Sequence, residues 1–159
     1  MRRFFLRMSD ISMLATTLLC LVVGISDGDT LTARCGVPGS FQEVKVRLAE
    51  IDAPEKKQPF GERSRQSLAY LCFQKAAQIR PSSKDRYGRT VARVTCDGQD
   101  ANAAQVRAGM AWVYTQYLTD PGLARLEREA RGARRGLWAD AQPVPPWEWR
   151  HHARHVEEL

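Results

Sequence analysis

The sequence predicts a protein of the α+β class that is mainly β, with five strands and about three helices. Its 159 residues allow one compact domain and little more. Five short segments show the alternation or the turn boundaries of strands. A helical pattern follows the third of these segments, and further helical patterns fill the second half. This order fits a small closed barrel of the OB type.

The composition excludes several other classes of protein. Hydrophobic residues make up 43% of the chain and charged residues 26%, which excludes collagen-like, coiled-coil and wholly disordered structures. No internal repeat is visible, so solenoids and propellers are excluded as well. The one long apolar run, from Ile11 to Gly24, is short for a membrane span.

The N-terminus has the character of a targeting segment. Arg2, Arg3 and Arg7 precede the apolar stretch ISMLATTLLCLVVG, as in a secretory signal. We therefore expect a leader over residues 1–20 and a secreted or periplasmic protein. An uncleaved N-terminal membrane anchor and a cytoplasmic location are the alternatives. The domain itself is expected over residues 21–140.

The first half of the domain reads as three strands. A strand is expected over residues 21–25 and its partner over 30–35. They are joined by a hairpin turn at 26–29, because Asp-Gly readily adopts the positive φ of such turns. After a loop over 36–40, hydrophobic and polar residues alternate over 43–51, which indicates a third strand with one buried face.

The second half mixes strands with helices and ends in a tail. Leucines and alanines recur at spacings of three and four between residues 123 and 137, which is typical of an amphipathic helix, and Gly136 would stop it. The tail over 141–159 is rich in Pro, Trp and His, and we expect it to pack irregularly over the domain. The other expected elements are a basic loop over 55–61, a helix over 62–76, a strand over 77–80, a polar loop over 81–88, a strand over 89–95 and a helix over 102–109.

The cysteines do not indicate a particular kind of site. Cys20 falls in the expected leader, which leaves Cys35, Cys72 and Cys96 in the body. Their spacings match no C-x-x-C zinc or redox pattern. Either one disulfide and one buried thiol form, or all three are small apolar core residues.

The distribution of charge suggests an anion-binding protein with a metal site. The formal net charge is +6, half of it from the arginines of the leader. Carboxylates cluster early in the chain, at Asp27, Asp29, Asp52 and Glu55. Carboxylates grouped within a basic protein favour a metal ion beside an anionic substrate. The alternative is that these side chains are solvated turn and helix residues.

Two segments carry carboxylates at spacings that suit a metal. In Asp27-Gly-Asp29, two carboxylates can face one side of a turn and offer hard oxygen ligands to Ca²⁺ or Mg²⁺, although such a turn is also ordinary hairpin chemistry. In VRLAEIDAPE (46–55), Asp52 at a strand end can hold a metal while Glu55 orients or deprotonates a water. Otherwise this segment is an edge-strand arginine, Arg47, followed by a solvated turn.

A third segment, DRYGR (85–89), adds an arginine at a strand start. Arg89 follows a glycine turn and Tyr87. Guanidinium groups from two strands, here Arg47 and Arg89, suit a phosphate because each donates bidentately to its oxygens.

DGDT, VRLAEIDAPE and DRYGR, in this order and spacing, resemble the staphylococcal nuclease family. The resemblance covers about residues 20–140 and includes Asn102, VRAGMAWVY (106–114) and GLW (136–138). It implies an OB-fold barrel with three helices. It also implies a Ca²⁺-dependent phosphodiesterase that cleaves DNA and RNA and leaves 3′-phosphate ends.

The resemblance also implies roles for individual residues. Asp29, Asp52 and the Ala53 carbonyl match calcium ligands, and Asp27 matches a supporting carboxylate. The catalytic trio corresponds to Arg47, Glu55 and Arg89. Tyr87 and Tyr117 fall where nucleotide-contacting tyrosines lie. Apart from the resemblance, we expect phosphate contacts from the basic side chains of Lys56, Lys57, Lys84 and Arg86.

The main rival function is a barrel that holds single strands without cutting them. Because all the carboxylates and both arginines are present, the sequence favours catalysis. We expect DNA and RNA as partners, single-stranded or locally opened. No protein partner is implied, and we expect a monomer.

Overall fold

The computed structural model describes residues 16–157, so most of the expected leader lies outside the described residues. Five strands form the barrel: β1 (Leu18–Asp27), β2 (Thr30–Cys35), β3 (Gln42–Leu48), β5 (Ala76–Lys84) and β6 (Thr90–Cys96). Neighbours in the order β3-β2-β1-β5-β6 pair antiparallel, and a parallel pairing of β3 with β6 closes the ring. The predicted five-stranded OB-fold barrel is confirmed.

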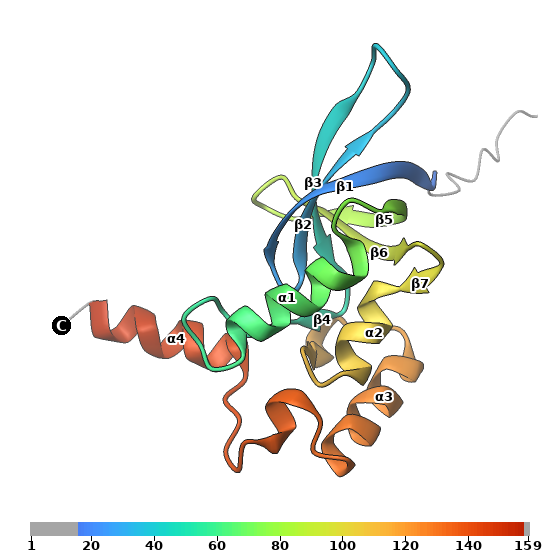
Figure 1. Cartoon of the computed structure of the whole chain (residues 1–159). Coiled ribbons are helices and arrows are strands. Elements are labelled where there is room, and N and C mark those ends of the chain that lie inside the picture. The colour runs from blue at the N-terminus through green and yellow to red at the C-terminus, as the bar shows by residue number, and fades with distance from the viewer. Residues whose placement is uncertain (1–15, 158–159) are drawn as a thin grey trace, which may run out of the picture.

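The helices gather on one side of this barrel (Figure 1). The α-helices are α1 (Gly61–Cys72), α2 (Ala101–Arg107), α3 (Pro121–Gly132) and α4 (Pro146–Glu157). The remaining elements are β4 (Ile51–Asp52), β7 (Gln99–Asp100), β8 (Trp112–Val113), and the 3₁₀ turns η1 (Thr115–Tyr117) and η2 (Gly136–Ala139). Within residues 16–157, none of the helices has the length and apolar character of a membrane span.

The core lies inside the barrel and beneath α1 and α2. Strand β6 alternates buried and half-buried residues along its whole length, so Ala92 and Val94 face inward. Leu68 of α1 and Val106 of α2 are fully buried against the same cluster. Burial of this alternating face explains why the strand pattern was readable from the sequence.

The cysteine expectations were wrong, because all four cysteines form disulfides. Cys20 and Cys35 lie opposite each other in the β1–β2 register and are bonded. Cys72, at the end of α1, is bonded to Cys96, at the end of β6. Strand β1 begins at Leu18, so the expected boundary between leader and domain, after residue 20, falls inside a barrel strand.

Several element boundaries also differ from the prediction. The strand expected over 43–51 ends as β3 at Leu48, because Glu50 takes a positive φ of 68° and Ile51 begins the separate strand β4. The segment expected as a polar loop over 81–88 continues as β5 as far as Lys84, because it pairs with β6 across a bulge between Pro81 and Ser83. Helix α1 ends at Cys72 instead of residue 76, and Gln74 then takes a positive φ of 59°.

The helix expected over 123–137 is likewise two elements. Helix α3 ends at Gly132, and Arg134 and Gly136 both adopt positive φ, near 53°. A Cβ on Gly136 would lie 2.3 Å from the carbonyl oxygen of Gly109, so only glycine allows this close approach. Leu137 therefore belongs to the separate turn η2.

The expectation of an irregular tail was wrong as well, because residues 146–157 form α4. Pro146 occupies the start of the helix, where its missing N–H costs nothing. Trp147 stacks on Tyr114 with ring centroids 5.4 Å apart and meets Trp112 edge-on at 5.6 Å. These contacts fix the first turn of α4 to the domain, and the rest of the helix extends away from the barrel (Figure 1).

Candidate active site

The β1–β2 hairpin presents the first two carboxylates. Asp29 is buried, and its side chain accepts hydrogen bonds from the Thr30 hydroxyl at 2.9 Å and the Ala53 backbone N–H at 2.7 Å. Asp27, two residues earlier, is half-buried. Burial and the nearby charges of Asp29 and Glu55 raise the pKa of Asp27. The carboxylates expected to act together are therefore close enough to affect one another.

Gly28, between these two aspartates, is required by packing. A Cβ at this position would lie 1.7 Å from Oγ of Ser64 in α1. The turn carbonyl is also held, because Nε2 of Gln105 donates to the Gly28 oxygen at 2.7 Å and to the Ser64 oxygen at 3.1 Å. Gln105 is fully buried in α2 and was missed by sequence reasoning. Its one signal was a polar residue on the inward face of a helix.

Asp52 supplies the third carboxylate from the end of β4. It pairs in register with Trp112 of β8, and only 1% of the residue is exposed. Burial raises the pKa of Asp52, although the neighbouring guanidinium groups of Arg150 and Arg47 oppose the shift. A buried carboxylate of this kind needs positive partners.

Arg47 of β3 joins Asp29 to Asp52. Its Nη1 donates to the carbonyl oxygens of Leu48 and Ile51, both at 2.8 Å, which fixes the plane of the guanidinium. Its Nη2 then lies 3.4 Å from Oδ2 of Asp29 and 3.3 Å from Oδ1 of Asp52. The structure thus brings together three predicted site residues around one nitrogen atom.

Glu55 follows Pro54 in the loop that leads to α1. Its backbone N–H donates to Oε1 of buried Gln58 at 3.0 Å, and Gln58 in turn donates to the carbonyl of Val144. The Glu55 side chain is 36% exposed, so it can reach both solvent and the buried carboxylates. Lys56 and Lys57, which follow it, are exposed.

Arg89 precedes β6 and lies beside the β3 edge, because Val46 pairs with Thr90. Its Nε donates to Asp85 at 2.6 Å, and its guanidinium lies 5.5 Å from the ring centroid of Tyr87. Among the described residues, Arg89 contacts these two side chains and not the carboxylate cluster. The structure therefore does not bring it into contact with Arg47 or Glu55.

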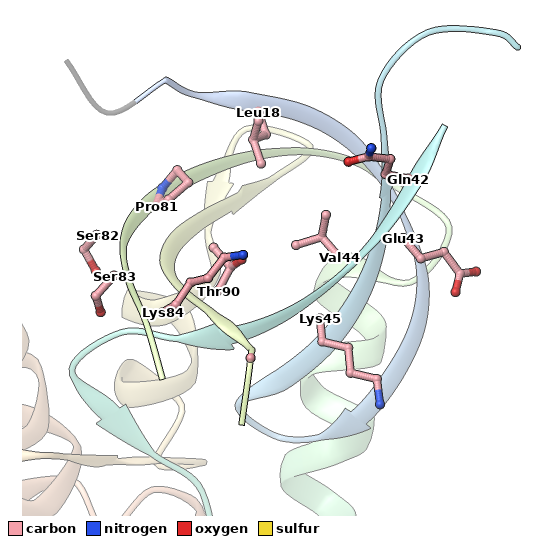
Figure 2. Close-up of a pocket in the computed structure, with 11 residues that line it drawn as sticks. Leu18, Gln42, Glu43, Val44, Lys45, Pro81, Ser82, Ser83, Lys84 and Thr90 are labelled. Carbon is pink, nitrogen blue, oxygen red and sulfur yellow. The ribbon is translucent and has the colours of Figure 1, made fainter. Parts of the chain in front are cut away.

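Five of the residues expected to contact nucleotides or phosphates are exposed: Lys56, Lys57, Lys84, Arg86 and Tyr87. Tyr87 is 69% exposed, and its hydroxyl accepts a hydrogen bond from Arg86 at 2.8 Å. Tyr117 lies in η1. Lys84 lines a groove of about 610 Å³ between β3 and the end of β5. Figure 2 shows Lys84 and Ser83 on one side of this groove and Val44 on the other. The carboxylates of the candidate site do not line it.

Sequence reasoning missed one residue that contacts the site directly, Arg150 of α4. Its Nη2 lies 2.7 Å from Oδ2 of Asp52, and its Nη1 lies 2.6 Å from Oε1 of Glu55. A single arginine in a tail that was expected to be irregular gives no sequence signal for such a contact. The buried, paired carboxylates and fixed arginines make an arrangement that could bind a cation and a phosphate.

The chain is similar to several known proteins along most of its length. An "Uncharacterized endonuclease" of Escherichia coli O157:H7 is 49% identical over 131 residues, which cover 82% of this chain and 83% of that protein. A protein of the same description from Haemophilus influenzae is 47% identical over 135 residues, covering 85% and 74%. A "Micrococcal nuclease" of Shigella flexneri is 42% identical over 146 residues, covering 85% and 82%.

The family model described as "Staphylococcal nuclease homologue" matches residues 45–140, which contain Arg47, Asp52, Glu55 and Arg89. The matched range holds three of the five residues that contact one another in the candidate site; the other two, Asp29 and Arg150, lie outside it. The resemblance seen in the sequence is confirmed: the chain belongs to the staphylococcal nuclease homologue family.

Proposed function

We propose that this protein is a nuclease that hydrolyses phosphodiester bonds of DNA and RNA with Ca²⁺ as its cofactor, leaving 3′-phosphate ends. The observation that carries the proposal is the position of Arg47. One of its nitrogens lies within 3.4 Å of both Asp29 and Asp52, beside the Glu55 loop. The names of the relatives, nuclease and endonuclease, support the same reaction class.

The chemistry of the donor set fits Ca²⁺. Among residues 16–157, no three His, Cys, Asp or Glu side chains converge closely enough to hold a metal on their own. The proposed set instead combines the Asp29 and Asp52 carboxylates with the Ala53 backbone carbonyl, and Asp27 supports them. Such hard oxygen ligands in flexible geometry suit Ca²⁺ better than Mg²⁺. When bound, Ca²⁺ would neutralise charge on a phosphate oxygen.

The protein's own groups would perform the remaining chemistry. Glu55 is exposed enough to hold a water, and its carboxylate would accept the proton of that water as it attacks phosphorus. The bond from phosphorus to the 5′ oxygen would break, and that oxygen would take a proton from solvent and leave as a 5′ hydroxyl. Arg47, already fixed by two backbone carbonyls, would donate to the oxygens that gain charge in the transition state. Arg89 would do the same from the β6 side, and Asp85 orients its guanidinium.

Two tyrosines and three lysines would position the substrate. Tyr87 offers a ring on which a base can stack, and Tyr117 is the second aromatic residue assigned to this role. Lys56, Lys57 and Lys84 would contact phosphates. A nucleic acid that stacks its bases on tyrosines must be single-stranded or locally opened. We expect the protein to act as a monomer.

The disulfides bear on where the protein works. Two disulfides tie Cys20 to Cys35 and Cys72 to Cys96. Disulfides persist in oxidising compartments, so we favour a secreted or periplasmic nuclease. A membrane-anchored form would carry the same domain, whereas a cytoplasmic form would keep these thiols reduced.

The rival function, binding without cutting, is separated from catalysis by one experiment. Cleavage of labelled single-stranded DNA is followed in Ca²⁺ and in excess EGTA for the wild-type protein, for Glu55→Gln, and for Glu129→Gln on the exposed face of α3 as control. We expect cleavage by the wild type and the control in Ca²⁺ alone, and binding without cleavage by Glu55→Gln. Removal of the new end phosphates by a 3′-phosphatase identifies the products.

Full cleavage in EGTA would overturn the calcium assignment. Binding by the wild type without any product would instead establish the rival function.

A further inference from the structure

Arg150 approaches the candidate site as a cation would. Its two terminal nitrogens donate to both oxygens of Asp52, at 3.1 and 2.7 Å, and Nη1 also donates to Glu55 at 2.6 Å. One guanidinium therefore spans two of the carboxylates to which calcium binding and water activation are assigned. Such forked contacts to carboxylates are among the strongest hydrogen bonds in proteins.

These contacts leave little room for a second positive group. Oδ1 of Asp52 accepts from Arg47 as well as from Arg150, and Oδ2 accepts from Arg150. The Asp52 side chain is 1% exposed, so water screens its partners poorly. A divalent cation placed on the same carboxylate would be repelled by the Arg150 guanidinium a few ångströms away.

The first turn of helix α4 anchors the helix to the domain and so positions Arg150. Trp147 lies three residues earlier, on the same face of the helix, and packs on Trp112 and Tyr114. After Arg150, residues 151–157 are all exposed. The helix can therefore leave the site without uncovering the barrel core, and Figure 1 shows α4 beside the loop before α1, reaching away from the barrel.

From this geometry we propose that Arg150 is an internal competitor for the active-site cation, so that cation binding displaces Arg150 and releases α4 from residue 150 onward. The inference rests on the proposed function, because it assigns a regulator to the same site. It adds a closed state, in which Arg150 neutralises Asp52 and Glu55, and an open state, in which the cation takes its place. Both ligands bind Asp52, and occupation by one excludes the other.

Competition of this kind lowers the apparent affinity for the cation. Only the open state accepts it, so the apparent dissociation constant equals the intrinsic one divided by the fraction of molecules in the open state. If the open state is about one-tenth populated, removing Arg150 should tighten binding roughly tenfold. The variant without Arg150 should therefore be saturated at a lower cation concentration, and the reaction that it catalyses should be the same.

Titration calorimetry with Ca²⁺ alone tests the competition. The full chain is compared as wild type, as Arg150→Gln and as Arg154→Gln. Arg154 is exposed on the same helix and controls for the loss of one positive charge without a contact to the site. We expect roughly tenfold tighter binding by Arg150→Gln and wild-type affinity in Arg154→Gln. Thermal melting verifies that each variant folds.

Hydrogen exchange of the wild-type chain tests the displacement and needs no variant. Saturation with Ca²⁺ should speed amide exchange in residues 150–157 while leaving the barrel strands protected. Equal Ca²⁺ affinities of the wild type and Arg150→Gln, or unchanged exchange of α4 at saturation, would overturn the inference. Calcium-dependent cleavage with either of these results leaves the proposed function standing. Absence of both binding and cleavage in every variant would overturn the two together.

Discussion

Asp52 and Arg150 lie 98 residues apart in the sequence, yet two hydrogen bonds of 3.1 and 2.7 Å join their side chains. Arg47 reaches the same carboxylate from the β3 side at 3.3 Å. The buried carboxylate thus lies between an arginine fixed by the barrel and an arginine carried by a peripheral helix. The first of these is suited to catalysis and the second to control.

Replacement of Arg47 by Lys should remove most of the turnover. An ammonium cannot donate to two carbonyls and to Asp52 while it also pairs with Asp29, as the Arg47 guanidinium does. We expect kcat to fall by about 10²–10³ with a much smaller change in KM, because the lost contact belongs to the transition state. The same loss is expected for Arg89→Lys. Steady-state kinetics give both constants, with Arg34→Lys on the exposed face of β2 as control.

Near-normal kcat in Arg89→Lys would assign that arginine to the Asp85 turn and not to the reaction.

Replacement of Gly28 by Ala should destabilise the domain and disturb the site. The new Cβ would lie 1.7 Å from Oγ of Ser64, so the hairpin or α1 must shift. Overpacking of this kind costs about 1–3 kcal/mol. Gly132→Ala is the matched control, because a Cβ there meets nothing within 4 Å and lies in helix α3. Urea unfolding should show a lower free energy of unfolding for Gly28→Ala and no decrease for Gly132→Ala. Equal stabilities of the two variants would contradict the packing argument.

Glu50 should contribute stability that disappears in acid. Burial raises its pKa, but hydrogen bonds from Thr119 and Asp120 and the charge of Arg93 outweigh burial, so the pKa of Glu50 lies below its ordinary value. The folded state therefore favours the ionised form, and the contribution is complete above the unfolded pKa near 4.3 and is lost as pH falls through the folded pKa.

We expect Glu50→Gln to cost about 1 kcal/mol at pH 7. The difference from the wild type should shrink below about pH 4.3. Urea unfolding from pH 7 to pH 3 measures it, and a difference that stays constant across this range would contradict the assignment.

Substrates that open easily should be cut fastest. If bases stack on Tyr87 and Tyr117, duplex DNA must unpair locally, at a cost of a few kcal/mol. Denatured DNA, RNA and A·T-rich duplex should therefore be cut faster than G·C-rich duplex in competition assays. Four phosphate contacts, from Lys56, Lys57, Lys84 and Arg86, would give a slope of about −3 for the logarithm of affinity against that of salt concentration. A preference for intact G·C-rich duplex would contradict this arrangement.

The barrel was predictable because each strand carries its own local signal. Alternation over β3 and β6 and the Asp-Gly turn before β2 are properties of adjacent residues. The end of β5 was not predictable in this way, since Pro81 and Ser83 read as loop residues. Pairing across a bulge with β6 makes them strand, and the partner lies in another part of the chain.

The same distinction between local and long-range signals applies to the site residues. Asp27, Asp29, Arg47 and Asp52 lie in short motifs whose spacing fixes their arrangement, and the structure brings them together. Arg150 depends on the docking of a whole helix. The prolines of the tail suggested an irregular structure, but the last of them is Pro146, the first residue of α4, where a helix tolerates proline.

The seam of the barrel has a consequence for folding. Val46, Arg47 and Leu48 pair in parallel with Thr90, Val91 and Ala92, and α1 and β5 lie between these strands in the sequence. Long-range parallel pairings form slowly, because a large loop must close before any contact is gained. Arg47 lies on one side of this seam and Arg89 begins the other. During refolding, helices and hairpins should therefore form first, and nuclease competence should appear with the final closure of the barrel.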